Sequence, residues 1–375
     1  MDLLLSDTQK WLQNEAKDFL KEKSCLLHTR KALEDASNQP HEIWREMADL
    51  GFMAITIPKE YGGLGLDYIS LCLLAKELGR KLYCGPFSSS IYLASEAMKL
   101  AGSHVQKEAY LPAIAKGEKI GCLAVTEKAG HETSKSCQTI CKDSEIYGEK
   151  IMVVDGCEAD FAIVLAKEAD MEQRRSLYLV SLRDKGVLKE PMKTIDGSRP
   201  HARLVFNKVK AELLGGRGDG VNLIKNIYDR AATLFAFEQL GGAEAALFMA
   251  RDYSLIRYSF GRPIGSYQAI KHKLAKVYVE NTLAKSNCFR AAYSLNENKK
   301  DLPLASAAAR VSSTKAYLLS AKENIQTHGG NGFTHEYDCH LYYRRAKMLA
   351  SNLGDLTFWK DRLVSELEAD SMSYH

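Results

Sequence analysis

The spacing of apolar residues changes twice along this chain of 375 residues, and these changes limit the folds that it can adopt. From residue 1 to about 117, apolar residues recur every three or four positions, which is typical of helices buried on one side. From about 118 to 213, short apolar runs alternate with polar residues, as in β-strands. From 214 onward the helical spacing returns. We therefore expect a mainly α protein with a central β domain and domains at 1–117, 118–213 and 214–375.

Local signals refine this expectation. Ser6 and Gln9 have the spacing of a capping box at a helix start, and a second helix is predicted from about Pro40 to Gly51. Strands are predicted at 120–124, 150–154, 161–165, 177–182 and 202–209. Five short strands separated by polar turns favour a small antiparallel β-barrel. Four or five helices after residue 220 predict a C-terminal bundle.

Composition excludes several classes of protein. The chain has 51 basic and 47 acidic residues, a net charge of +4 that is too small to indicate a nucleic-acid surface. No apolar run approaches the roughly 20 residues that cross a bilayer, and the first residues lack the basic start of a signal peptide. Nine scattered cysteines are typical of a cytoplasmic protein. Cys137 and Cys141 with His131 could be metal ligands, but ordinary thiols are the better interpretation because a second ligand pair is missing.

Several strings resemble the acyl-CoA dehydrogenase family of flavoproteins, bacterial members included. They are IPKEYGGLG (57–65), CLAVTE (122–127), RYSFGRPIGSYQ (257–268), QTHGGNGFT (326–334) and HLYYRRA (340–346). The resemblance covers nearly the whole chain in the family's order. It implies a helical domain, a β-barrel and a helical bundle, with FAD as cofactor and an acyl-CoA thioester oxidised between Cα and Cβ. It also implies a homo- or hetero-oligomer, dimer or tetramer, that passes electrons to an electron-transferring flavoprotein.

The resemblance also implies cofactor-binding residues. Cys122, Val125 and Thr126 match the strand end that lies along the flavin ring, although Thr126 could merely complete a turn. Arg257 matches a contact to the FAD diphosphate, although a cation there also suits a helix C-terminus. The remaining matched positions are Ser259, Phe260, Gln268, Gln326, Gly329, Gly330, Asp355 and Thr357. The two glycines also fit a plain turn between helices.

The catalytic carboxylate is missing from its usual place. The family's commonest base is a Glu before Gly, and that position is Leu353, which cannot take a proton. The family's other base position matches alanines at 231–232. Asp229 lies two residues away and is the candidate for a displaced base; the alternative is a surface residue near a helix start. Asp355 is better interpreted as a helix N-cap than as a base.

Two further departures keep other functions open. Residues 128–133 replace the family's Pro-Gly-Ala-Gly-Ser-Asp, and Met152-Val153-Val154 replaces Trp-Ile-Thr beside the flavin. We expect an active acyl-CoA dehydrogenase with a displaced base. The alternatives are a base-lacking subunit that completes a catalytic homologue, and a flavin-free scaffold of the same fold.

Overall fold

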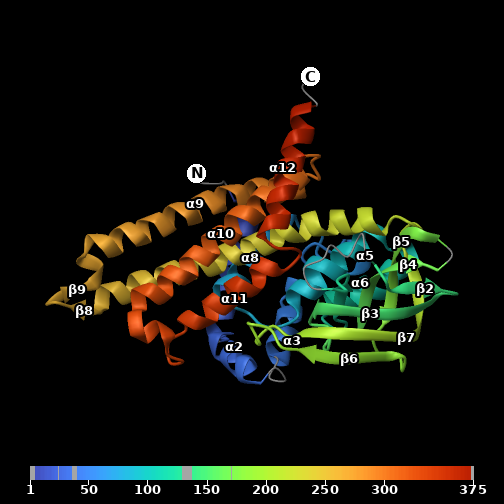
Figure 1. The fold of residues 1–375 in the computed structure, drawn as a ribbon, viewed down its shortest axis with the longest axis horizontal. Coiled ribbons are helices and arrows are strands. Elements are labelled where there is room, and N and C mark those ends of the chain that lie inside the picture. The colour runs from blue at the N-terminus through green and yellow to red at the C-terminus, as the bar shows by residue number, and fades with distance from the viewer. Residues whose placement is uncertain (1–4, 24, 36–39, 129–136, 170, 373–375) are drawn as a thin grey trace. The chain divides into compact units, whose positions relative to one another are not determined.

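The computed structural model describes residues 5–23, 25–35, 40–128, 137–169 and 171–372, with helices before and after a set of strands (Figure 1). Tertiary contacts divide the chain into two units. The first comprises Met1–Lys31, Asp67–Tyr83 and Ala232–His375, and the second Ala32–Leu66 and Cys84–Ala231. Each unit therefore joins segments that are distant in sequence. Of the described helices, none combines the length and the apolar character needed to span a bilayer.

The first unit is helical. Its α1 begins with the predicted capping box, because Ser6 Oγ accepts from the Gln9 N–H at 3.2 Å and Gln9 Oε1 accepts from the Ser6 N–H at 3.0 Å. Gly241 lets α8 approach α4 closely, since a Cβ there would lie 1.8 Å from the Lys76 carbonyl oxygen. The helices with residues in this unit are α1 (Asp7–Glu22), α2 (Cys25–Glu34), α4 (Tyr68–Arg80), α8 (Gly220–Ile256), α9 (Gln268–Asn296), α10 (Leu302–His328), α11 (Cys339–Ser351) and α12 (Leu356–Met372). The predicted C-terminal helices are confirmed.

Several helices of the second unit precede its strands, and the first residues of α8 follow them. The predicted helix after Pro40 is confirmed as α3 (His41–Asp49). The helical spacing around 91–94 belongs to a π-helix, Ser88–Ser95, a rarer form that occurs often at functional sites. It leads into α5 (Glu96–Ala101), and α6 (His104–Ala115) follows. Short 3₁₀ turns lie at Phe52–Ala54 and Lys59–Tyr61.

Strands of the second unit form the predicted barrel. They are β1 (Gly121–Ala124), β2 (Ile140–Lys142), β3 (Glu145–Val154), β4 (Phe161–Glu168), β5 (Met171–Ser181), β6 (Val187–Met192) and β7 (His201–Leu214). The pairing β4-β2-β3-β7-β5-β4 closes on itself, with β1 and β6 attached to β4 and β7. Most pairs are antiparallel, but β1 and β2 run parallel to β4. The sequence did not predict β2, which is only three residues long, or β6, whose side chains are half-buried or exposed.

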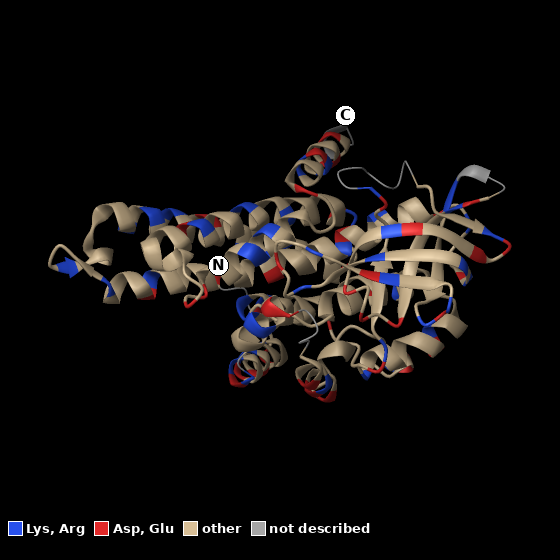
Figure 2. Cartoon of the chain, turned by 60° about the horizontal axis from the view of Figure 1, so that its bottom comes forward, with Lys and Arg blue, Asp and Glu red and all other residues tan. Residues whose placement is uncertain are grey.

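Charged residues of both signs are interspersed along the described helices and strands (Figure 2). Acidic and basic segments lie next to each other on the β-strands as well as on the long helices. This mixture agrees with the small net charge of +4.

Candidate active site

The residues directly after β1, Val125 and Thr126, belong to the segment that is expected to bind the flavin ring. Cys122 is buried, and burial raises the pKa of its thiol, which stays protonated. Val125 is buried and Thr126 is half-buried. The Thr126 carbonyl accepts a hydrogen bond from the Ile151 N–H at 2.8 Å, which attaches this segment to β3. Among the described residues, no acceptor meets the Thr126 N–H. An N–H without a protein partner at a half-buried position suits an acceptor atom of a ligand.

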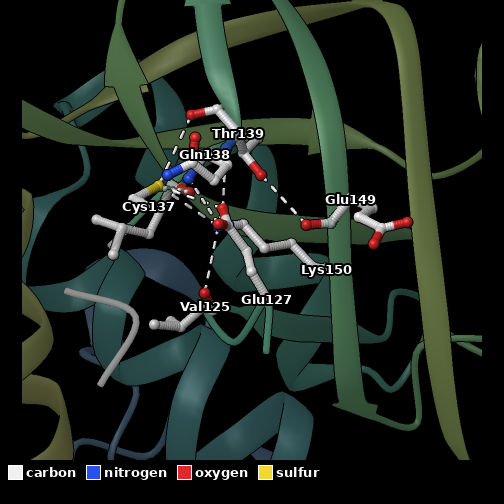
Figure 3. A network of polar contacts seen from close by, with 8 residues as sticks. Val125, Glu127, Cys137, Gln138, Thr139, Glu149 and Lys150 are labelled. Atoms are coloured by element: carbon white, nitrogen blue, oxygen red, sulfur yellow. Dashed lines mark hydrogen bonds and ion pairs between the residues drawn. The ribbon is translucent and has the colours of Figure 1, made fainter. Parts of the chain in front are cut away.

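A buried ion pair lies directly behind this segment (Figure 3). The Lys150 ammonium on β3 donates to Glu127 Oε1 at 2.6 Å and to the Val125 carbonyl at 3.2 Å. Glu127 also accepts from the backbone N–H groups of Gln138 at 2.6 Å and Thr139 at 2.9 Å. Burial alone would raise the pKa of Glu127, but the Lys150 charge and these hydrogen bonds lower it to about 2. The carboxylate is therefore ionised at neutral pH.

The segment that departs from the family's Trp-Ile-Thr lies at the end of β3. Met152 is 40% exposed and is a flexible thioether at the position where the resemblance predicts an aromatic neighbour of the flavin. Asp155, which follows, is buried. Its carboxylate accepts from Ser89 Oγ at 2.7 Å and from Arg199 Nη2 at 3.2 Å, so it is satisfied within the second unit.

The candidate base Asp229 is buried. Its residue is 3% exposed and lies ten positions into α8, so the interpretation as a surface residue near a helix start is wrong. Next to it, Arg230 Nε donates to Glu96 Oε2 at 2.8 Å, and Lys99 also pairs with Glu96. Burial would raise the pKa of Glu96, but the Lys99 and Arg230 charges lower it. Glu96 is therefore an ionised partner of two cations, which makes it a poor proton acceptor.

The loop that carries Leu353 is held by a buried arginine. Arg310 on α10 donates through Nη2 to the carbonyls of Leu349 and, at 2.7 Å, Asn352. These are carbonyls at the end of α11, where a cation is favourable. Leu353 has a φ of +59°, a left-handed conformation that is uncommon for a side chain with a Cβ. The sequence analysis missed Arg310, because nothing in a helical pattern shows that one charged position points inward.

Asp355 ends the same loop as a helix cap. Its Oδ1 accepts from the Phe358 N–H at 2.8 Å, which confirms the N-cap interpretation at the start of α12. Asp355 and Thr357 are both exposed. Their predicted contacts with FAD remain predictions.

Two other strings of the resemblance come together in the first unit. Arg257 follows α8 and opens the hairpin of β8 (Tyr258–Ser259) and β9 (Arg262–Pro263). Tyr253, in the last turns of α8, stacks on His328 at the end of α10 with ring centroids 4.0 Å apart. Asn331, beyond His328, donates to the Tyr253 hydroxyl at 3.0 Å. The hairpin and the glycine turn are thus anchored side by side, although 60 to 70 residues separate them in sequence.

Both anchored segments leave room for a ligand. Arg257 is exposed, and in the described part of the chain its guanidinium bonds to no protein group. Gly329 has a φ of +58°, so the turn does need a glycine there. A Cβ added at Gly261, Gly329 or Gly330 would meet no atom within 4 Å, so these backbone groups are approachable. Gln268 and Gln326 lie at the start of α9 and in the last turn of α10.

Cys137 and Cys141 belong to no cluster of potential metal ligands within the described part of the chain. The structure groups no three potential ligands among the residues that it describes, and all nine cysteines are free. Cys137 is buried and its Sγ lies 3.3 Å from Glu127 Oε1. His131 lies outside the described residues.

These donors fit the cofactor that the resemblance implies. A planar guanidinium binds phosphate oxygens, and the first unit offers an exposed one at Arg257, beside a turn at 329–330 whose glycines leave room for a ligand. The second unit offers the Thr126 N–H to a ring heteroatom. Each unit by itself therefore offers groups that suit one part of a flavin dinucleotide.

Comparison with known proteins decides the family. The model of the acyl-CoA dehydrogenase N-terminal domain matches residues 6–118, and that of the C-terminal domain matches residues 218–355. Acyl-CoA dehydrogenase IpdE2 of Mycobacterium tuberculosis is 30% identical over 90% of this chain and 90% of its own. The chain belongs to the acyl-CoA dehydrogenase family. It is thus an acyl-CoA dehydrogenase-like flavoprotein, that is, an FAD-dependent oxidoreductase that acts on acyl-CoA.

Solved acyl-CoA dehydrogenases share the fold. Butyryl-CoA dehydrogenase from Megasphaera elsdenii superimposes with a TM-score of 0.90 at 25% identity, covering 98% of this chain and 100% of that one. The steroid ACAD Tcur3481–Tcur3483 does so with a TM-score of 0.88 at 25% identity, covering 98% and 99%. The predicted fold class, mainly α with a central β-barrel, is confirmed.

Proposed function

We propose that this acyl-CoA dehydrogenase catalyses α,β-dehydrogenation of an acyl-CoA thioester with Asp229 as the base. The observation that carries the proposal is the burial of Asp229 on α8, two residues before the family's second base position at 231–232. Asp229 supplies a carboxylate close to that position, where residues 231 and 232 are alanines. Leu353, at the position that the resemblance assigns to the usual base, cannot take a proton.

The residues of this chain then have separate tasks. Asp229 takes the α-proton of the thioester. The hydride that leaves the β-carbon needs an acceptor, which bound FAD would supply. Thr126, with Cys122 and Val125 beside it, would hold the flavin ring, and Arg257 with the 329–330 turn would hold a diphosphate. Ser259, Phe260, Gln268, Gln326, Asp355 and Thr357 are proposed as the other FAD contacts.

Purified protein loaded with FAD tests this function. We expect a yellow flavin spectrum that is bleached by acyl-CoA thioesters. Asp229→Asn should keep the flavin spectrum and lose at least a hundredfold in the bleaching rate, the usual range for a general base. Asp252→Asn is the matched control, since Asp252 lies on the same helix, is exposed and pairs with Arg251. Full activity of Asp229→Asn would refute the displaced base.

A second candidate is a base-lacking subunit of a mixed oligomer. It is favoured by Leu353 and by apolar side chains that the first unit leaves exposed near its hairpin and on α9. They are Ile256, Tyr258, Phe260, Tyr278, Leu283 and Phe333. One solved relative is named as a pair, Tcur3481–Tcur3483. An isolated chain that is colourless, but completes a yellow and active complex with a homologue, would select this candidate. A colourless chain in both settings would leave the flavin-free scaffold.

We further infer a cytoplasmic enzyme that passes electrons to an electron-transferring flavoprotein. Nine free cysteines support a reducing compartment. Oxygen-insensitive turnover that depends on added electron-transferring flavoprotein is the expected result.

A further inference from the structure

We propose that Lys150 raises the reduction potential of the flavin by polarising the peptide group between Val125 and Thr126. The inference rests on the proposed FAD site. It concerns a residue that does not touch the ring itself but acts through the peptide that does.

Lys150 is placed for this task by the barrel. It lies on β3 and is 0% exposed, although lysine is among the residues least often buried. Its ammonium reaches both the Glu127 carboxylate at 2.6 Å and the Val125 carbonyl at 3.2 Å (Figure 3). Glu127 is itself fixed by backbone N–H groups of Gln138 and Thr139. These contacts hold the ammonium in one position, from which it donates to the Val125 carbonyl.

The Val125 carbonyl and the Thr126 N–H belong to one peptide group. Resonance couples the two ends of that group, so a cation bound at the oxygen makes the N–H a stronger donor. As described above, the Thr126 N–H meets no acceptor among the described residues. The carbonyl on the other side of Thr126 is held by the Ile151 N–H. Thr126 is thus fixed on both sides while its donor remains available to a ligand.

The sign of the effect follows from charge. Reduction adds electron density to the flavin ring, so a stronger N–H donor stabilises the reduced cofactor more than the oxidised one. Glu127 and Lys150 together carry no net charge, so their fields largely cancel at a distance. The remaining influence passes through the Val125 carbonyl. Loss of Lys150 should therefore lower the potential.

The test is the reduction potential of bound FAD, measured by equilibration with a reference dye, in four variants. Lys150→Met removes the cation. The double variant Glu127→Gln with Lys150→Met removes one negative and one positive charge, so the net charge of the protein is unchanged. It also leaves no unpaired carboxylate buried at position 127. Glu127→Gln alone keeps the ammonium on Val125. Lys142→Met, at an exposed position of β2, is the matched control for a lost surface charge.

We expect the ratio of reduced to oxidised flavin at fixed dye potential to fall about tenfold in Lys150→Met and in the double variant. That change is about 30 mV for a two-electron couple. Glu127→Gln should not lower the ratio, and Lys142→Met should leave it unchanged. An unchanged potential in flavin-loaded Lys150→Met and double variant overturns the inference. So does loss of flavin from both variants with the fold retained by circular dichroism, since Lys150 would then only position the segment. A wild-type chain that holds no FAD overturns the proposed function instead.

Discussion

The Glu127 carboxylate should make the stability of this acyl-CoA dehydrogenase depend on pH in the acid range. It accepts from Lys150 Nζ and from two backbone N–H groups, and its side chain is only 10% exposed. Its pKa is about 2 in the folded protein, compared with an ordinary value of 4.5. A carboxyl with a lowered folded pKa stabilises the fold fully above its unfolded pKa and loses that contribution as pH falls toward the folded value.

The size of this contribution follows from the shift. One pKa unit corresponds to about 1.4 kcal/mol, so the ionised Glu127 contributes about 3 kcal/mol above about pH 5. Roughly 2 kcal/mol of it should be lost between about pH 5 and about pH 3, because the unfolded chain takes up its proton first. Glu127→Gln cannot titrate at this position. The stability difference between wild type and this variant should therefore shrink by the same amount.

Urea unfolding of both proteins, followed by fluorescence at about pH 5 and about pH 3, measures this difference. Glu149→Gln is the control, because Glu149 lies next to Lys150 on β3 but forms an exposed pair with Arg203. Exposed pairs contribute about 0–1 kcal/mol, so the control should differ little from wild type at either pH. A wild-type advantage over Glu127→Gln that is equal at both pH values would refute the reasoning.

Two further predictions concern packing and assembly. Gly241→Ala should destabilise the protein by about 3 kcal/mol, because the new Cβ would overlap the Lys76 carbonyl. Thermal unfolding measures this loss. Gly216→Ala is the control, since its Cβ would lie at an ordinary 3.8 Å from the Asp219 Cβ. Phe260→Ser should leave the monomer's stability unchanged but weaken association in analytical ultracentrifugation, because Phe260 is 94% exposed and contributes nothing to the core. An oligomer of undiminished stability would contradict the second prediction.

Local signals predicted the parts of the site that depend on backbone geometry. Gly329 adopts the left-handed φ that a turn after α10 requires, and Asp355 caps α12. Both are determined within a few residues, so sequence spacing reveals them. The burial of Asp229 was missed because helical spacing gives its position on α8 but not what packs over it.

The sequence by itself determined the order of the helical and β segments and the family, while the loss of the usual base at Leu353 stays a prediction. Those features depend on periodicity, motifs and residue identity, which are local along the chain. Tertiary structure decided that Lys150 is buried with Glu127 behind Val125, and that Arg310 holds the carbonyls before Leu353. Such pairs join residues more than 20 positions apart. Their energies depend on burial and on the partner that the fold brings within hydrogen-bond distance, and neither quantity is encoded in the spacing of residues.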